Sequence, residues 1–155
     1  MKSRDKIAYV LYMTNAVIAI AFGLRYASCE TVMPYHQQAI GLEWTELGLG
    51  LQILLNGFMK GTASAFFIVG ASSMVLLLIP FRKGEIWSKW LIPFVQIASL
   101  APAVYVSINI ASKTQASTPW PVAIATAGIT IVAFLVSGVF LKTDENTTVR
   151  SVTSI

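Results

Sequence analysis

One stretch decides the fold: residues 47–79 read LGLGLQILLNGFMKGTASAFFIVGASSMVLLLI and carry a single charge, that of Lys60. A helix needs about 20 apolar residues to cross the ~30 Å hydrocarbon core of a bilayer. The stretch is longer than one crossing requires, and its one charge lies inside it rather than at an end. It therefore predicts a membrane-spanning helix with a specialised polar part.

Three further apolar stretches, residues 7–24, 90–110 and 121–141, follow the same pattern. Hydrophobic residues make up 55% of the chain and charged residues 12%, whereas about a quarter of the residues in soluble proteins are charged. Within lipid only helices and closed barrels satisfy their backbone groups, and these uninterrupted runs lack the alternation of barrel strands. We therefore predict an all-α fold, a polytopic four-helix bundle over residues 1–141 with a polar tail at 142–155.

The net charge of +4 does not indicate a nucleic-acid partner. The basic residues stand at the ends of apolar stretches, where they fix the orientation of a membrane protein. A single cysteine, Cys29, excludes an internal disulfide and a cysteine-rich metal site. We expect no nucleic acid, no metal and no cofactor, and we expect membrane lipid as a partner, with a membrane protein or a second copy as a further one.

The charges also predict an orientation. Two segments are rich in basic residues, namely the N-terminus, with Lys2, Arg4 and Lys6, and the second connection, with Arg82, Lys83 and Lys89. The first connection holds Arg25 together with Glu30, Glu43 and Glu46, and the third holds Lys113. The positive-inside rule therefore predicts four spans with both termini, and the tail at 142–155, in the cytoplasm.

The N-terminus imitates a secretory signal peptide, with basic residues ahead of an apolar run. That run is longer than a usual signal core, and Arg25 and Tyr26 follow it where a processing site needs small residues. We expect the segment to be retained as the first helix.

A polar stripe marks the long second stretch. Gln52, Asn56, Lys60 and Ser64 recur every four residues and so share one helix face. Exposing amides and an ammonium group to lipid is costly, so the stripe should face other helices or a hydrated cavity. It predicts either a ligand pocket, with Gln52, Asn56 and Lys60 in its wall, or hydrogen bonds that hold the bundle together.

The long first connection places further ionisable groups at the same level. Met33-Pro34-Tyr35-His36 predicts a turn into a short helix. Glu43 follows His36 by seven residues, so the two side chains would lie on the same face if that helix continued. His36, Glu43 and Glu46 are the candidates for a catalytic role, and Arg25, Tyr105 and Asn109 join the polar stripe as candidates for ligand binding. One histidine and scattered glutamates match no zinc or di-iron spacing.

Smaller patterns predict how the helices pack. Polar residues at helical spacing should form hydrogen bonds between helices: Tyr12 and Asn15, Gln96 and Ser99, Thr126 and Thr130. Gly57 and Gly61 indicate close packing, within the bundle or across a dimer. Pro80 is expected to end the second helix.

The turn Arg82-Lys83-Gly84-Glu85-Ile86-Trp87-Ser88-Lys89-Trp90 resembles the basic-x-Gly-Glu-x-Trp turn of several small four-helix bacterial membrane families, including DoxX-like proteins. The resemblance covers this turn and the number of helices. It implies a four-helix bundle in a bacterial inner membrane and carries over no catalytic residue.

Two functions follow from these patterns. The first is a small integral membrane accessory or interaction protein, in which the polar stripe stabilises the bundle. The second is a membrane enzyme or binding protein for a lipid-like amphipathic molecule near the outer leaflet, with Arg25 and Lys60 holding an anionic head and His36 or a glutamate moving a proton. Four short-looped helices without paired intramembrane carboxylates make a transporter the weaker alternative.

Overall fold

A computed structural model describes residues 1–139, and in this part of the chain the secondary structure is helical throughout. Three helices are long and apolar enough to cross a membrane: α1 (Ser3–Ala27), α3 with the turn that follows it (Leu49–Phe81) and α4 (Ile86–Lys113). A fourth apolar helix, α5 (Trp120–Val136), is shorter, with 17 residues. The predictions of an all-α fold and of membrane helices are confirmed, whereas the end of the fourth stretch and the tail at 142–155 lie outside the described residues.

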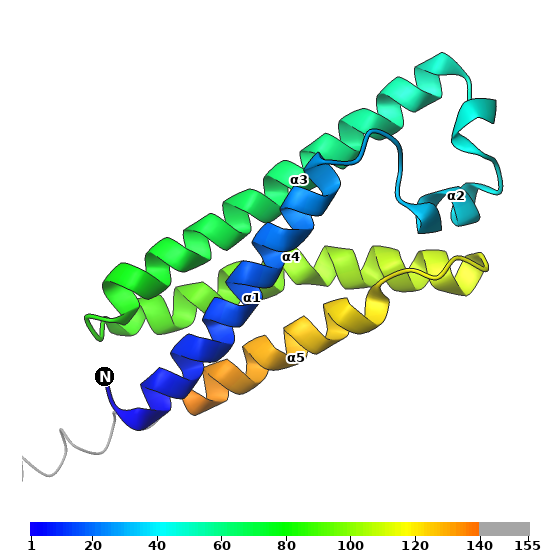
Figure 1. The fold of residues 1–155 in the computed structure, drawn as a ribbon. Coiled ribbons are helices and arrows are strands. Elements are labelled where there is room, and N and C mark those ends of the chain that lie inside the picture. The colour runs from blue at the N-terminus through cyan, green and yellow to red at the C-terminus, as the bar shows by residue number, and fades with distance from the viewer. Residues whose placement is uncertain (140–155) are drawn as a thin grey trace, which may run out of the picture.

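The helices run alternately up and down (Figure 1). The N-terminus, the turn at residues 82–85 and the C-terminal end of α5 meet at one end of the molecule, here called the turn end. At the other end, the α2 end, the first connection forms α2 (Pro34–Ile40) and the short 3-10 helix η1 (Trp44–Glu46). The helix predicted from Met33-Pro34-Tyr35-His36 is therefore confirmed.

The four long helices are not packed evenly. Helix α1 contacts both α3 and α5, and α4 packs along α5. By contrast, α3 and α4 meet near the turn and diverge toward the α2 end, where α2 lies between them (Figure 1). This divergence creates the space described below as the candidate site.

Glycines set the close approach of α1 to α3. A Cβ atom on Gly70 would lie 2.6 Å from Ile20 Cγ1 and 2.9 Å from the Ala16 carbonyl oxygen, and one on Gly23 would lie 3.2 Å from the Ala63 carbonyl oxygen. Without a side chain at these two positions, the backbones can approach closely, as in many membrane helix pairs. Among residues 1–139 nothing lies within 4 Å of such an atom on Gly57 or Gly61, so their predicted packing is not found within this part of the chain, and the dimer alternative stays a prediction.

A buried polar network joins α1, α4 and α5 near the middle of the bundle. Asn15 Nδ2 donates to the Thr126 carbonyl oxygen at 2.9 Å and to Thr130 Oγ1 at 2.8 Å. Thr130 Oγ1 in turn lies 3.0 Å from Gln96 Oε1, and Gln96 Nε2 donates to the Tyr12 carbonyl oxygen at 3.2 Å. The predicted hydrogen bonds between helices are confirmed for the side chains of Asn15, Gln96 and Thr130. For the other three residues the prediction is wrong: the hydroxyl groups of Thr126 and Ser99 donate to carbonyl oxygens of their own helices, and the buried Tyr12 hydroxyl has no hydrogen-bond partner among residues 1–139.

The turn end is closed by aromatic packing and one ion pair. Phe81 is buried against the rings of Tyr9 and Tyr12. Lys89 forms an ion pair with Asp5 and also donates to the Ser137 carbonyl oxygen at 2.9 Å. The pair is largely buried and connects α4 to the start of α1 and the end of α5.

The prediction that Pro80 ends the helix is wrong, because the chain continues to Phe81 through a π-helical turn, η2 (Leu77–Phe81). Proline lacks an N–H donor, and its ring collides with the preceding turn of an α-helix. A wider π-helical turn relieves that collision. The Pro80 carbonyl oxygen then accepts a 3.0 Å hydrogen bond from Glu85 N, and Gly84 closes the turn with a φ of 81°.

We expect Gly70→Ala to destabilise the protein by about 1–3 kcal/mol, because the added methyl group meets the backbone of α1 as well as the Ile20 side chain, and the backbone cannot move aside on its own. Gly57→Ala is the matched control, since the same methyl group enters open space on the same helix. The measurement is the melting temperature of the purified protein in detergent. Equal melting temperatures for the two variants would contradict the close approach at Gly70.

Candidate functional site

An apolar cavity with two adjoining chambers lies between the long helices at the α2 end. The wide chamber has a volume of about 530 Å³ and the narrow chamber, deeper in the bundle, about 90 Å³. The chambers adjoin, because six residues line both of them: Tyr26, Phe66, Val69, Ser99, Ala103 and Ser107. The combined space runs from beneath α2 to the polar network in the middle of the bundle.

The walls of the wide chamber come from the two helices that diverge. Helix α3 contributes Leu55, Met59 and Thr62, and α4 contributes Pro102, Val106 and Ile110. Phe58 and Val106 line the chamber from opposite sides and are nevertheless 65% and 51% exposed. The chamber therefore opens sideways between α3 and α4.

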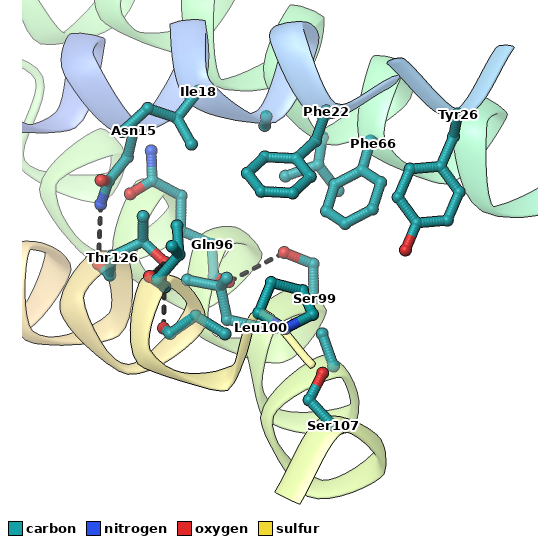
Figure 2. A pocket seen from close by; sticks show the side chains of 16 residues that line it. Asn15, Ile18, Phe22, Tyr26, Phe66, Gln96, Ser99, Leu100, Ser107 and Thr126 are labelled. Carbon is teal, nitrogen blue, oxygen red and sulfur yellow. Dashed lines mark hydrogen bonds between the residues drawn. The ribbon is translucent and has the colours of Figure 1, made fainter. Parts of the chain in front are cut away.

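The narrow chamber has aromatic walls and a polar floor (Figure 2). Figure 2 shows Asn15, Gln96 and Thr126 together at one end, with Phe22 and Phe66 between them and Tyr26. Asn15 Oδ1 is buried and has no hydrogen-bond partner among residues 1–139. Since buried acceptors are normally paired, the floor can accept a hydrogen bond from a water molecule or a ligand.

Tyr26, Tyr35 and His36 form what we call the roof of the wide chamber, at the α2 end. The two phenol oxygens hydrogen-bond to each other, and the His36 ring lies 4.2 Å from the Tyr35 ring and 6.4 Å from the Tyr26 ring. Burial lowers the pKa of His36 and raises the pKa of Tyr35, and the hydrogen bond between the Tyr35 and Tyr26 phenols raises the latter further. The imidazole and the Tyr35 phenol are therefore uncharged at neutral pH.

The polar stripe on α3 does not line this cavity. Gln52 donates to the carbonyl oxygens of Trp44 and Leu47 at 2.8 and 3.0 Å. Asn56 donates to the Glu30 carbonyl oxygen at 3.4 Å. Each amide thus connects α3 to the backbone of the first connection.

Lys60 binds the end of α1. Its Nζ atom donates to the carbonyl oxygens of Ala27, at 2.6 Å, and Cys29, at 2.9 Å. The last carbonyl groups of a helix have no partner within it and carry partial negative charge, so a lysine satisfies both their hydrogen bonds and their charge. Of the two alternatives for the stripe, the contacts of Lys60 favour the hydrogen-bonded bundle over the ligand pocket.

The remaining charged candidates lie apart from the roof. Arg25 Nη1 donates to Cys29 Sγ at 3.0 Å. Helix α2 ends at Ile40, where Gly41 has a φ of 75°. His36 and Glu43 therefore do not lie on one face of a continuous helix. Glu43 and Glu46 instead cap η1 reciprocally, with Glu43 N donating to Glu46 Oε2 at 2.8 Å.

Tyr105 and Asn109 line a shallow hollow between α4 and α5, together with Ala127 and Ile131. This hollow shares neither the roof nor the wide chamber. The structure therefore brings His36 alone, of all the predicted site residues, to the cavity. Within the described residues, no group of three or more His, Cys, Asp or Glu side chains is placed to hold a metal.

Sequence reasoning missed most of the residues that form the cavity. Tyr26 lies at the end of α1 and Tyr35 on α2, and both pack against the buried cluster of Val32, Met33 and Met59, where their hydroxyl groups meet. Phe66 and Ala103 look like ordinary residues of a membrane span. Nothing in the sequence distinguishes them. They line the cavity because they lie on the side where α3 and α4 diverge.

We expect the melting temperature of the protein to fall between pH 7 and pH 5, partly because of His36. Its pKa is lower in the folded protein than in the unfolded chain, so the unfolded chain takes up a proton first as the pH falls. The stabilisation is thus present above the unfolded pKa of about 6.5 and is lost below it. Thermal melts of wild type and His36→Gln across this range test it, and equal slopes would contradict the burial of a neutral imidazole.

No family model, no curated protein and no solved structure matches this chain. The resemblance of residues 82–90 to DoxX-like turns stays a prediction. The function is therefore argued from the cavity, its roof and its sideways opening.

Proposed function

We propose that this protein binds the apolar chain of a lipid-like amphipathic molecule in the two-chamber cavity. The observation that carries the proposal is the half-open apolar space of about 530 Å³ between α3 and α4. Ligand cavities typically measure roughly 300–1,000 Å³ and combine apolar walls with a few polar groups. This cavity has that composition, with polar groups at the roof and the floor and a few serine and threonine side chains along its walls.

The sideways opening supports a ligand that comes from the membrane. Phe58 and Val106 stand at the opening on helices of membrane-spanning length. A molecule dissolved in the bilayer can enter between them without leaving the hydrocarbon. A water-soluble substrate would instead need a polar entrance, and the walls at this opening are apolar.

We also propose that α5 spans the membrane as the fourth helix, with both termini in the cytoplasm. Its 17 residues measure about 25 Å, near the lower limit for a span. Six basic residues lie at the turn end against Asp5 and Glu85: Lys2, Arg4, Lys6, Arg82, Lys83 and Lys89. This orientation places the cavity at the extracytoplasmic side, and the resemblance of the turn suggests a bacterial inner membrane.

A second candidate function is that of an accessory protein that binds a membrane protein or another copy of itself. The observation that favours it is the open space around Gly57 and Gly61 on α3, beside the exposed Leu54 and Phe58. Small residues on an unpartnered helix face let another helix approach closely. This face adjoins the opening of the wide chamber, because Phe58 belongs to both, whereas Gly57 and Gly61 do not line the chamber.

The cavity is tested by filling it. Ala103 lines both chambers, so Ala103→Phe should weaken binding of a fluorescent long-chain probe by about tenfold or more, which is a change of about 1.4 kcal/mol. Ala101→Phe is the matched control, because it adds the same side chain to an exposed position on the same helix. Absence of probe binding to the wild type, or equal binding by both variants, would overturn the proposal.

The orientation is tested by cysteine labelling in intact cells, with Cys29 first replaced by serine. We expect Lys113→Cys to react with a membrane-impermeant maleimide added outside, and Lys83→Cys to react only after the cells are opened. Both positions are exposed, so access to the reagent decides the outcome. Labelling of Lys83→Cys alone from outside would show the opposite orientation.

A further inference from the structure

We infer that the amphipathic molecule is uncharged and carries a hydroxyl-type or carbonyl-type head that hydrogen-bonds to the Tyr26–Tyr35–His36 roof. A long-chain alcohol represents this class, as opposed to a fatty-acid anion, a phospholipid or a cationic amphiphile. The inference rests on the proposed function and specifies the ligand of the same cavity. It differs from the sequence-based expectation of an anionic head held by Arg25 and Lys60.

The lining of the cavity carries the first step. Among the residues that line the two chambers there is no Asp, Glu, Lys or Arg. Moving an ionised group from water into such surroundings without a partner costs several kcal/mol or more. A charged head in the chamber would have no counter-charge, whereas an uncharged head needs only hydrogen bonds.

The nearest cations are already bound elsewhere. Lys60 donates to the carbonyl oxygen of Ala27, the last residue of α1, and to that of Cys29, and Arg25 donates to Cys29 Sγ. Neither side chain lines a chamber. Two of the three N–H donors of Lys60 are used by these acceptors, which carry partial negative charge and would lose their partner if the side chain moved into the chamber.

The roof offers the hydrogen-bonding groups that an uncharged head requires. When one phenol donates to the other, the pair still has one O–H donor and several lone pairs. A neutral imidazole adds one N–H donor and one acceptor nitrogen. A hydroxyl group both donates and accepts, so it can use both kinds of site.

The position of the roof sets the direction of the ligand. Tyr35 and His36 belong to α2, outside the long helices, whereas the narrow chamber lies deeper among them. A head beneath α2 leaves the chain pointing along Phe66 toward the narrow chamber. This direction matches that of a lipid in the leaflet nearest the α2 end, which keeps its polar group toward the interface.

The test compares competitors with one chain length and different heads. The full-length protein in detergent is loaded with the fluorescent probe, which is displaced by hexadecanol, hexadecyl methyl sulfone, hexadecyl sulfonate or hexadecyl trimethylammonium. The sulfone and the sulfonate have heads of nearly equal size and differ in charge, and both ionic heads keep their charge at any working pH. Ala103→Phe, with the cavity filled, corrects for partition of each competitor into the micelle.

We expect the alcohol and the sulfone to displace the probe at concentrations at least tenfold below those of the two ionic competitors. A sulfonate or trimethylammonium compound that competes as well as the uncharged pair would overturn the inference while leaving the cavity function intact. Failure of the wild type to bind the probe at all would remove the cavity function and this inference together. The two failures are therefore distinguishable.

A second comparison locates the head. His36→Lys places a cation at the roof, and we expect it to improve competition by the sulfonate at least tenfold. Gln37→Lys adds the same charge to the neighbouring residue of α2, which does not line the cavity, and should leave the order of competitors unchanged. Equal responses of the two variants would overturn the placement of the head at the roof. If His36→Lys does not fold, the order of competitors on the wild type decides whether the head is uncharged.

Discussion

The hydrogen-bonded network of Asn15, Gln96 and Thr130 is the interaction on which the rest of the structure depends. In lipid the hydrophobic effect does not distinguish one helix face from another, so directional hydrogen bonds and close packing must set how the helices are rotated. This network fixes α1, α4 and α5 relative to one another at the middle of the bundle. The same rotation of α4 directs Ala103 and Ser107 toward the cavity rather than toward lipid.

Helix α3 is held by different means, and this explains why a cavity exists. It packs against α1 through Gly23 and Gly70, and its polar stripe contacts the first connection and the end of α1 rather than α4. No hydrogen bond between the side chains of α3 and α4 is found within residues 1–139. The two helices therefore share only the turn end and leave a space that α2 covers but does not fill (Figure 1).

Much of the fold could be predicted from the sequence, because apolar run length and proline or glycine signals act locally. The long helices, the short helix after Pro34 and the polar contacts between α1, α4 and α5 follow from such signals. The prediction for Pro80 was wrong because a π-helical turn accommodates this proline. The packing expected at Gly57 is not found among residues 1–139, because small residues indicate close packing but not which helix packs there.

The candidate site was far less predictable. Of the predicted residues only His36 lines the cavity, since Lys60, Gln52 and Asn56 bind backbone carbonyl groups. Every residue has such a carbonyl group, so the sequence gives no sign of which ones will be acceptors. The cavity itself arises from the divergence of two helices. Residues such as Phe66 and Ala103 give the same sequence pattern whether they face a neighbouring helix, a lipid or a cavity.

The contact between Lys60 and the end of α1 has a consequence for how this protein can change over generations. Its acceptors are main-chain oxygens of Ala27 and Cys29, and these oxygens persist whatever side chains stand at the two positions. For this contact only the lysine has to be inherited unchanged, although the Cys29 side chain is used separately, as the acceptor of a hydrogen bond from Arg25. Substitution at Ala27 leaves its carbonyl oxygen in place, so the chain beside the roof can change there while Lys60 continues to hold it to α3.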